Sequence, residues 1–257
     1  MNVAPVLLRL SAGSTTVSID ECLSAKLLPL VLSVIAGSVD IIGFLALGGL
    51  FSAHITGNIV VLAAKLVAGE AAPVSYLISV PIFIFVLAMT KLLAVGLGRL
   101  HLASLTPLLL LQLLLLAAAL VPGVGAGEHI DPNSGPMIFV GMMCVSAMAV
   151  QNALVRLSIQ GAPSTAVLTT NITLATMDLG ELLLGRDRAS SIKAGDRVRH
   201  TWPAIAGFLL GCALGAACES MFGLQSLALP VGLAMLALIM GAAAARHYRQ
   251  HTERRMR

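Results

Sequence analysis

Charged residues are scarce in this sequence. Only 11% of its 257 residues are Asp, Glu, Lys or Arg, whereas soluble domains carry about 25%. Apolar residues make up 58%, the mean hydropathy is +0.94, and these residues fall in long runs that short polar stretches separate. This pattern excludes a water-soluble globule and predicts an integral membrane protein.

Cysteine pairs and catalytic signatures are also missing. The four cysteines show no CxxC spacing, so the sequence predicts neither a disulfide framework nor a metal site. No HExxH, GxSxG or glycine-rich phosphate loop occurs, and we therefore expect no enzyme activity and no cofactor. The net charge is +4, but the basic residues flank apolar runs. Their expected partner is the anionic headgroups of a lipid bilayer, and no nucleic acid is expected.

Six apolar runs are long enough to cross a bilayer, which needs about 20 helical residues. These six firm spans are 28–50, 74–98, 105–124, 137–158, 203–222 and 225–245. Two further stretches, 53–69 and 163–185, are shorter or more polar. We predict an all-α, polytopic integral membrane protein with six firm transmembrane helices and two shorter re-entrant or broken Thr-Asn helices, or eight crossings if these two also span.

The distribution of Lys and Arg favours six crossings. Ten of the sixteen such residues lie in a basic loop, 186–200, and in a tail, 246–257, and the positive-inside rule places both in the cytoplasm. With six crossings the loop 125–136 faces outward and Arg99 and Arg156 lie at cytoplasmic ends, whereas eight crossings misplace two signals. We expect both termini, including residues 1–27, on the cytoplasmic side of the membrane.

A short polar pattern occurs twice in the chain. The sequence ITGNI at 55–59 returns as LTTNI at 168–172, 113 residues later. Residues 28–124 and 137–245 therefore form the two halves of a predicted two-fold internal repeat. Three crossings per half would make it an inverted-topology repeat, which many secondary transporters share, and an even number would make it a parallel one.

The residues around this pattern carry a family resemblance. They are Gly37, Asp40, Phe44, Gly48, Gly49, Phe51, His54 and Thr56-Gly57-Asn58 in the first half, with Gln151, Asn152, Arg156, Thr165 and Thr169-Thr170-Asn171 in the second. With them the chain resembles the YoaK-like family of uncharacterised bacterial integral membrane proteins (domain of unknown function 1275) over about residues 28–245. The resemblance implies a multi-span inner-membrane protein and supplies no substrate. Thr170 departs from the family's Thr-Gly-Asn triplet, so a positive φ is not expected there.

Asp40 is the strongest single functional signal. It lies near the middle of the span 28–50, where a carboxylate costs about 2.5–3.5 kcal/mol and tends to face the bundle interior or a cavity. Burial disfavours the charged form of a carboxyl group, so a proton can be loaded and released near neutral pH. The alternative is a hydrogen-bonded aspartate that fastens one helix to another.

The other predicted substrate-binding residues are polar side chains near the two repeated patterns. His54 lies one helical turn before Asn58, and a helix puts both on one face; the alternative for His54 is an interfacial histidine. The remaining ones are Thr56, Gln151, Asn152, Thr169 and Asn171. Their hydroxyl and amide groups can replace the hydration of a small polar solute, and they can equally hold helices together.

Two further features predict contacts between helices. Asp178 and Glu181 share a helix face and are expected to pair with Arg186 or Arg188. Glycines recur every fourth residue at 207, 211 and 215, and such a stripe lets another helix approach closely. The partner helix belongs either to the same chain or to a second copy in a homodimer.

The leading hypothesis is a small-solute transporter or channel, proton-coupled through Asp40, in which the two Thr-Asn segments meet near the midplane. The alternative is a non-transporting membrane scaffold or sensor, and a membrane enzyme with Asp40 and His54 as its acid–base pair comes third. A cavity joining Asp40 with Asn58 and Asn171 favours transport. Dry helix contacts favour the scaffold, and a closed pocket holding Asp40 and His54 in hydrogen-bond reach favours the enzyme.

Overall fold

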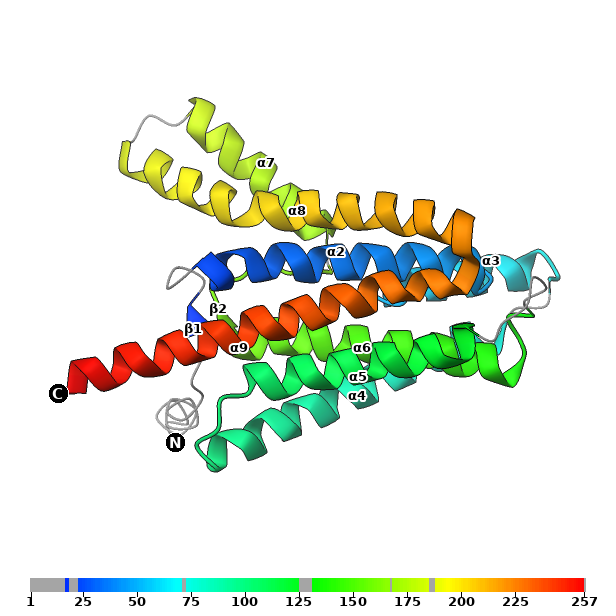
Figure 1. Cartoon of the computed structure of the whole chain (residues 1–257). Helices are drawn as coiled ribbons and strands as arrows, with labels where there is room; N and C mark the ends of the chain where they lie inside the picture. Colours follow the sequence, from blue (N-terminus) through cyan, green and yellow to red (C-terminus); the bar gives the residue numbers. More distant parts are fainter. Residues whose placement is uncertain are drawn as a thin grey trace, which may run out of the picture.

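The protein is an all-helical bundle (Figure 1). The computed structural model describes residues 17–18, 23–70, 73–124, 131–166, 168–184 and 188–256. The helices are α2 (Leu23–Ala46), α3 (Ile55–Val67), α4 (Val74–Arg99), α5 (Leu105–Val124), α6 (Gly135–Ser158), α7 (Leu168–Leu184), α8 (Arg188–Phe222), the short 3-10 helix η1 (Gly223–Leu227) and α9 (Ala228–Met256). Two-residue strands, β1 (Val17–Ser18) and β2 (Ile159–Gln160), pair in parallel.

Among the described residues, five segments are long and apolar enough to cross a membrane. Four of them are α2, α4, α5 and α6, and the fifth, Ser190–His247, covers both α8 and α9, which η1 joins as a hairpin. The predicted all-α, multi-pass membrane architecture is confirmed at this level. Many large apolar side chains of α4, α7 and α8 face outward, as lipid-facing helices require.

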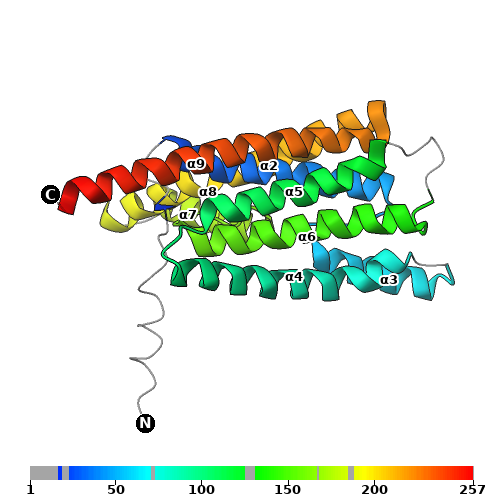
Figure 2. The ribbon, with the colours of Figure 1, turned by 60° about the horizontal axis from the view of Figure 1, so that its bottom comes forward.

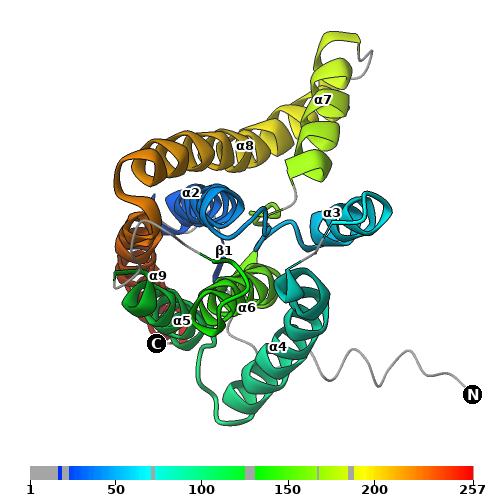
Figure 3. The ribbon, with the colours of Figure 1, turned by 90° about the vertical axis from the view of Figure 1, so that its right-hand side faces the viewer.

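The long helices α2, α4, α5, α6, α8 and α9 run roughly along one axis and alternate in direction (Figures 1 and 2). We call the end where α2 begins and α9 ends the terminal end, and the opposite one the far end. Helix α3 lies at the far end, whereas α7 leans out at the terminal end. Viewed along the axis, α2 and α6 occupy the centre, α8 and α4 lie on opposite sides of them, and α3 and α7 share one flank (Figure 3).

The central helices pack mainly against helices that come from the other part of the chain. Helix α2 packs most extensively against α8 and also against α9, whereas α6 packs against α4 and α5. Because α2 and α6 are covered in this way, they are the most deeply buried of the long helices. Polar side chains in the middle of α2 and α6, such as Asp40 and Gln151, are therefore buried.

The glycine stripe of α8 is the surface on which α2 packs. A Cβ atom on Gly207 would lie 2.7 Å from the carbonyl oxygen of Leu30, and one on Gly211 would contact the backbone of Val34. Only glycine allows the two helix backbones to come this close. The stripe is thus buried within one chain and offers no surface to a second copy, so the expected homodimer loses this support.

The predicted basic loop 186–200 is helical over the residues that the structure describes. From Arg188 onward these residues form the first turns of α8, which continue without a break into the apolar part of the helix. Polar residues mark where a segment leaves the apolar layer of a membrane. They do not end the helix here, because Ala, Lys and Arg are good helix formers. The basic tail is likewise helical as far as Met256. Residues 125–130 of the predicted outer loop lie outside the described residues.

Candidate functional site

The first helix break follows α2 because two glycines there adopt left-handed backbone angles. Gly48 has φ +71° and Gly49 has φ +97°, a region that side chains with a Cβ rarely adopt. The amide of Gly49 donates to the carbonyl of Phe44 at 2.9 Å, which closes the helix end. The Tyr76 hydroxyl of α4 donates to the Gly48 carbonyl at 2.5 Å, and a Cβ on Gly49 would lie 2.6 Å from that hydroxyl.

Asp40 holds the chain segment that leads into α3. Its Oδ1 accepts from the backbone amides of Ser52 at 2.7 Å and Ala53 at 2.6 Å. Its Oδ2 lies 2.5 Å from Nδ1 of His54. The residue is only 3% exposed. Asp40 therefore acts as a buried anchor with three hydrogen-bond partners.

His54 caps the start of α3 and faces a pocket. Its ring lies edge-on to the ring of Phe208, with centroids 5.2 Å apart, and its side chain is 35% exposed. The pocket, which we call the Asp40 pocket, has a volume of about 530 Å³. It is lined by Asp40, Ile41, Phe44, Phe51, His54, Thr56, Gly57, Phe208 and Cys212. Apart from Asp40, His54 and Thr56, its wall is made of aromatic, aliphatic and sulfur atoms.

Asn58 of α3 also holds the segment that leads into α3, through hydrogen bonds to the backbone of Phe51. Its Oδ1 accepts from the amide of Phe51 at 2.8 Å and its Nδ2 donates to the carbonyl of Phe51 at 2.8 Å. The Nδ2 group also donates to the hydroxyl of Ser79 on α4 at 3.0 Å. Asn58 is fully buried. Its amide thus replaces the backbone partners that a helix or water would supply to Phe51.

A related arrangement surrounds the second break, between β2 and α7. The Nδ2 group of Asn171 donates to the carbonyl of Ser164 at 2.5 Å. Gln151 of α6 donates through Nε2 to the hydroxyl of Thr165 at 2.9 Å and to the carbonyl of Leu32 on α2 at 2.8 Å. Its Oε1 accepts from Gln112 of α5 at 2.7 Å. This buried amide pair therefore ties the break to both halves of the chain.

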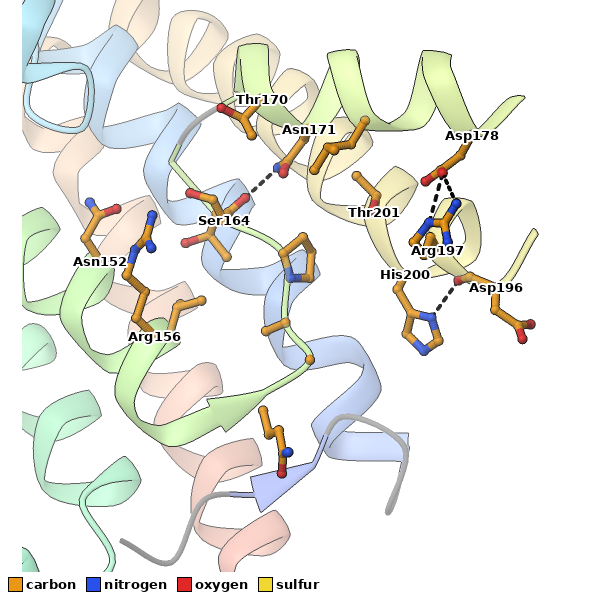
Figure 4. Close-up of a pocket in the computed structure, with 17 residues that line it drawn as sticks. Asn152, Arg156, Ser164, Thr170, Asn171, Asp178, Asp196, Arg197, His200 and Thr201 are labelled. Carbon is orange, nitrogen blue, oxygen red and sulfur yellow. Dashed lines mark hydrogen bonds and ion pairs between the residues drawn. The ribbon is translucent and has the colours of Figure 1, made fainter. Parts of the chain in front are cut away.

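A second pocket opens beside this break (Figure 4). We call it the Arg156 pocket, and its volume is about 680 Å³. Its walls come from the end of α6, the segment after β2, α7 and the start of α8. Its polar lining residues are Asn152, Arg156, Gln160, Ser164, Thr165, Thr170, Asn171, Asp178, Asp196, Arg197, His200 and Thr201. It is far more polar than the Asp40 pocket.

An ion-pair group closes one side of the Arg156 pocket. The guanidinium of Arg197 donates to Oδ1 of Asp178 at 2.8 and 2.5 Å and to Oε2 of Glu181 at 3.1 Å. The hydrogen bond to Asp178, followed by the nearby negative charges, raises the pKa of Arg197. The side chains of the predicted partners, Arg186 and Arg188, lie outside the described residues. Arg197 pairs with both carboxylates because α7 and α8 pack together and bring residue 197 beside residue 178.

The structure separates the predicted substrate-binding residues into three groups. Asp40, His54 and Thr56 line the Asp40 pocket, whereas Asn152 and Asn171 line the Arg156 pocket. Asn58 and Gln151 are fully buried in hydrogen bonds and line neither. Thr169 is exposed, lines neither pocket, and its carbonyl accepts from Thr173.

The expected single cavity joining Asp40 with Asn58 and Asn171 is not what these two pockets form: Asp40 lines one, Asn171 lines the other, and Asn58 lines neither. The reason is that backbone groups at a helix break need partners, and the amide side chains turn inward to supply them. His54 and Asn58, expected on one shared face, accordingly point to different surroundings: the ring to the pocket, the amide to Phe51.

Sequence reasoning missed several residues that shape the two pockets. Tyr76 and Ser79 of α4 hold the first break, and Arg197 and His200 line the second pocket. The last two lie three residues apart just before the apolar part of α8, a spacing that puts them on one helix face. Nothing in the sequence showed that this face lines a pocket together with α6.

The chain matches the family described as protein of unknown function (DUF1275) over residues 28–240. No curated protein and no solved structure matches it.

Proposed function

The chain belongs to the DUF1275 family of proteins of unknown function, and we propose that it is a small-solute transporter or channel of the bacterial inner membrane. Asp40 and Asn171 line different pockets, so the shared cavity that would have favoured transport does not carry this proposal; what carries it is the pair of helix breaks inside an apolar bundle, each beside a pocket. Irregular backbone at membrane depth is tolerated only where protein or a water-filled cavity covers it. In secondary transporters such breaks form the solute site.

The two breaks support an internal repeat. Asn58 donates to the carbonyl of Phe51 and Asn171 donates to that of Ser164, so each amide reaches back seven residues. The packing of α2 on α8 and α9 has its counterpart in the packing of α6 on α4 and α5. We therefore propose two halves related by a two-fold axis in the membrane plane, which is an inverted repeat.

Six crossings fit this arrangement. The helices α2, α4, α5, α6, α8 and α9 would cross, α3 would dip in from the far end, and α7 from the terminal end (Figures 1 and 3). Basic residues of the long helices lie at the terminal end: Arg99, Arg156, Lys193 and Arg246. Glu70 and Asp131 lie at the far end. The positive-inside rule then makes the terminal end cytoplasmic, beside anionic headgroups.

Asp40 and His54 are the proposed carriers of a coupling proton. Their Oδ2 and Nδ1 atoms are 2.5 Å apart, so a proton can pass between them without any movement of the chain. His54 lies on the pocket wall, and Asp40 stands behind it. A solute or water in the Asp40 pocket would exchange the proton with the histidine, and the carboxylate would balance its charge.

A scaffold or sensor is the second candidate, because Asp40, Asn58 and Gln151 all have internal partners that hold helices together. In that case the polar residues stabilise the bundle, and the Asp40 pocket is filled by acyl chains. The two candidates differ in whether water reaches this pocket.

Cys212 provides a native probe of that difference, since it lines the Asp40 pocket. With the other three cysteines changed to alanine, Cys212 is the sole thiol. A transporter predicts that a charged, membrane-impermeant thiosulfonate modifies Cys212 in cells, as mass spectrometry would detect. The matched control keeps only Cys144, which is buried and should not react. If Cys212 reacts solely with a lipid-soluble maleimide, the pocket faces lipid and the transport proposal fails.

Proton coupling has its own test. A thermal-shift screen of small polar solutes on the purified protein would supply a solute for uptake into proteoliposomes. Asp40→Asn should remove the dependence of uptake on the pH gradient while leaving the labelling of Cys212 intact. Unchanged pH dependence in that variant would contradict the role of Asp40.

A further inference from the structure

The Arg156 pocket contains an exposed guanidinium that no other described residue neutralises. Arg156 lies in the last turn of α6 and lines the pocket. Within the part of the chain that the structure describes, its side chain makes no hydrogen bond or ion pair. A guanidinium presents a planar set of N–H donors that fits the paired oxygens of a carboxylate or phosphate.

The other charged side chains of the pocket do not cancel Arg156. Asp178 and Glu181 are engaged by Arg197. Asp196 lies on a wall shared with a neighbouring hollow, where it is accompanied by Lys26 and Arg199, and its carboxylate points away from Arg156 (Figure 4). The α6 side of the pocket therefore carries a positive charge without a counterion.

The neutral lining of the pocket is suited to a polar molecule. Asn152, Thr170, Asn171 and Thr201 line it with amide and hydroxyl groups. Its volume of about 680 Å³ lies within the range of about 300–1,000 Å³ that small-molecule sites occupy. The site is therefore large enough for a small organic anion.

The first half of the chain provides a contrast. In the Asp40 pocket the chain supplies its own carboxylate, which is bound to the amides of Ser52 and Ala53. The second break has no carboxylate on Gln151 or its neighbour Asn152, and the nearest charged side chain of α6 is that of Arg156. The Asp40 pocket thus already contains an anionic group with its own partners, whereas the Arg156 pocket contains a cationic group that can attract an anion.

We propose that the Arg156 pocket binds the carboxylate or phosphate group of a small polar solute. This inference rests on the proposed transport function, for which it specifies an anionic substrate class and a first binding position at the terminal end. The same anionic group can also come from a lipid headgroup, because the pocket lies at the end of the bundle where α6 terminates.

Thermal unfolding of the purified full-length chain in a neutral detergent tests the proposal. The probes are inorganic phosphate and lactate, with sodium chloride at equal ionic strength and uncharged lactamide as controls. At least one anion should raise the unfolding midpoint more than its control does. Its apparent affinity should fall about tenfold in Arg156→Gln, which is about 1.4 kcal/mol, because the charge-assisted hydrogen bond to the anion is lost. The control is Arg99→Gln, which alters another exposed arginine, at the end of α4. Arg99 lies at the terminal end of the bundle, as Arg156 does, and this variant should bind the anion as the parent does.

Nanodiscs separate the two sources of the anionic group. If the unfolding midpoint rises only in nanodiscs of phosphatidylglycerol, not in those of phosphatidylcholine, and the rise is lost in Arg156→Gln, the bound group is a lipid headgroup. In that case the solute assignment is overturned. Equal responses to lactate and lactamide, with no effect of phosphate or of anionic lipid, overturn the anion site altogether. Neither result affects the labelling of Cys212 at the other pocket, so failure of this inference is distinguishable from failure of the transport proposal.

Discussion

The two helix breaks have the same asparagine contact but different surroundings. The break before α3 is held by Asp40 of α2, Asn58 of α3 and Tyr76 of α4, and its pocket is walled by aromatic rings. The break before α7 is held by amides, and its pocket is larger and more polar. At the first break the polar groups are bound to one another. At the second break charged and polar groups line the pocket and are available to a ligand.

The difference shows that two similar sequence patterns can lead to different local contacts and different pockets. Both breaks must satisfy backbone groups that water cannot reach. The first break does so with a carboxylate and a phenol in addition to its asparagine, which leaves little polar surface at its pocket. The second break does so with Gln151 and Asn171, and Arg156 stays free of internal partners. Substitutions that affect one half more than the other can test this reading.

The largest expected effect comes from the helix contact between α2 and α8. In Gly211→Val the new side chain would meet the backbone of Val34, and neither helix can yield without losing its neighbours. Overpacking of this kind costs about 1–3 kcal/mol or more. We expect a large fall in the unfolding midpoint or loss of folded protein in size-exclusion chromatography.

Gly232→Val is the matched control, since Gly232 lies in α9 with open space around it. It should unfold within a few degrees of the parent. Equal losses in both variants would mean that the glycine stripe does not set the packing of α8 on α2.

The two asparagines should differ in what their removal costs. Asn58→Ala removes three hydrogen bonds and leaves both backbone groups of Phe51 without partners, and each buried group left unpaired costs about 1–3 kcal/mol. Asn171→Ala removes one bond, to the carbonyl of Ser164. In thermal unfolding, the midpoint should fall further in Asn58→Ala than in Asn171→Ala. The reverse order would contradict the claim that the first break is held by more internal hydrogen bonds.

Tyr76→Phe gives a smaller effect that is confined to the first half. It removes the bond to the carbonyl of Gly48 and keeps the ring, so we expect a loss of about 1 kcal/mol. Amide hydrogen exchange should become faster in residues 47–54 and stay unchanged in the segment before α7. Faster exchange at both breaks would show that they are not independently held.

The smallest effect on overall stability is expected for Arg197→Gln. The guanidinium is half exposed, and exposed ion pairs contribute little to stability. Asp178, however, is buried and would lose its partner, so α7 should exchange its amides faster while the unfolding midpoint hardly moves. Lys65→Gln, which removes the exposed pair with Glu70 at the far end, should change neither quantity at α7.

Helix positions could be predicted from the sequence with good accuracy. The expected span 105–124 coincides with α5, and 74–98 differs from α4 by one residue. The two Thr-Asn stretches also became the short helices α3 and α7. Hydrophobic length decides these elements, because a helix must match the bilayer and polar residues mark its ends. The end of α2 was placed four residues late, since Gly48 and Gly49 stop the helix within the apolar run.

The directions of the polar side chains could not be predicted in the same way. Gln151 finds its partner on Leu32 of α2, and the glycines of α8 meet α2 as well. The sequence separation in both cases exceeds a hundred residues, so no local pattern specifies the contact. Residue types alone allowed each amide to face either a solute or a backbone carbonyl.

The sequence by itself determined that the chain is helical, apolar and broken at two related places, because these properties follow from local composition and from the length needed to cross lipid. Only the tertiary structure decided that Asp40 binds the backbone before α3, that the two breaks adjoin different pockets, and that Arg156 has no partner among the described residues. Such outcomes depend on which helices become neighbours, and in this bundle the neighbours of α2 and α6 come from the opposite half of the chain.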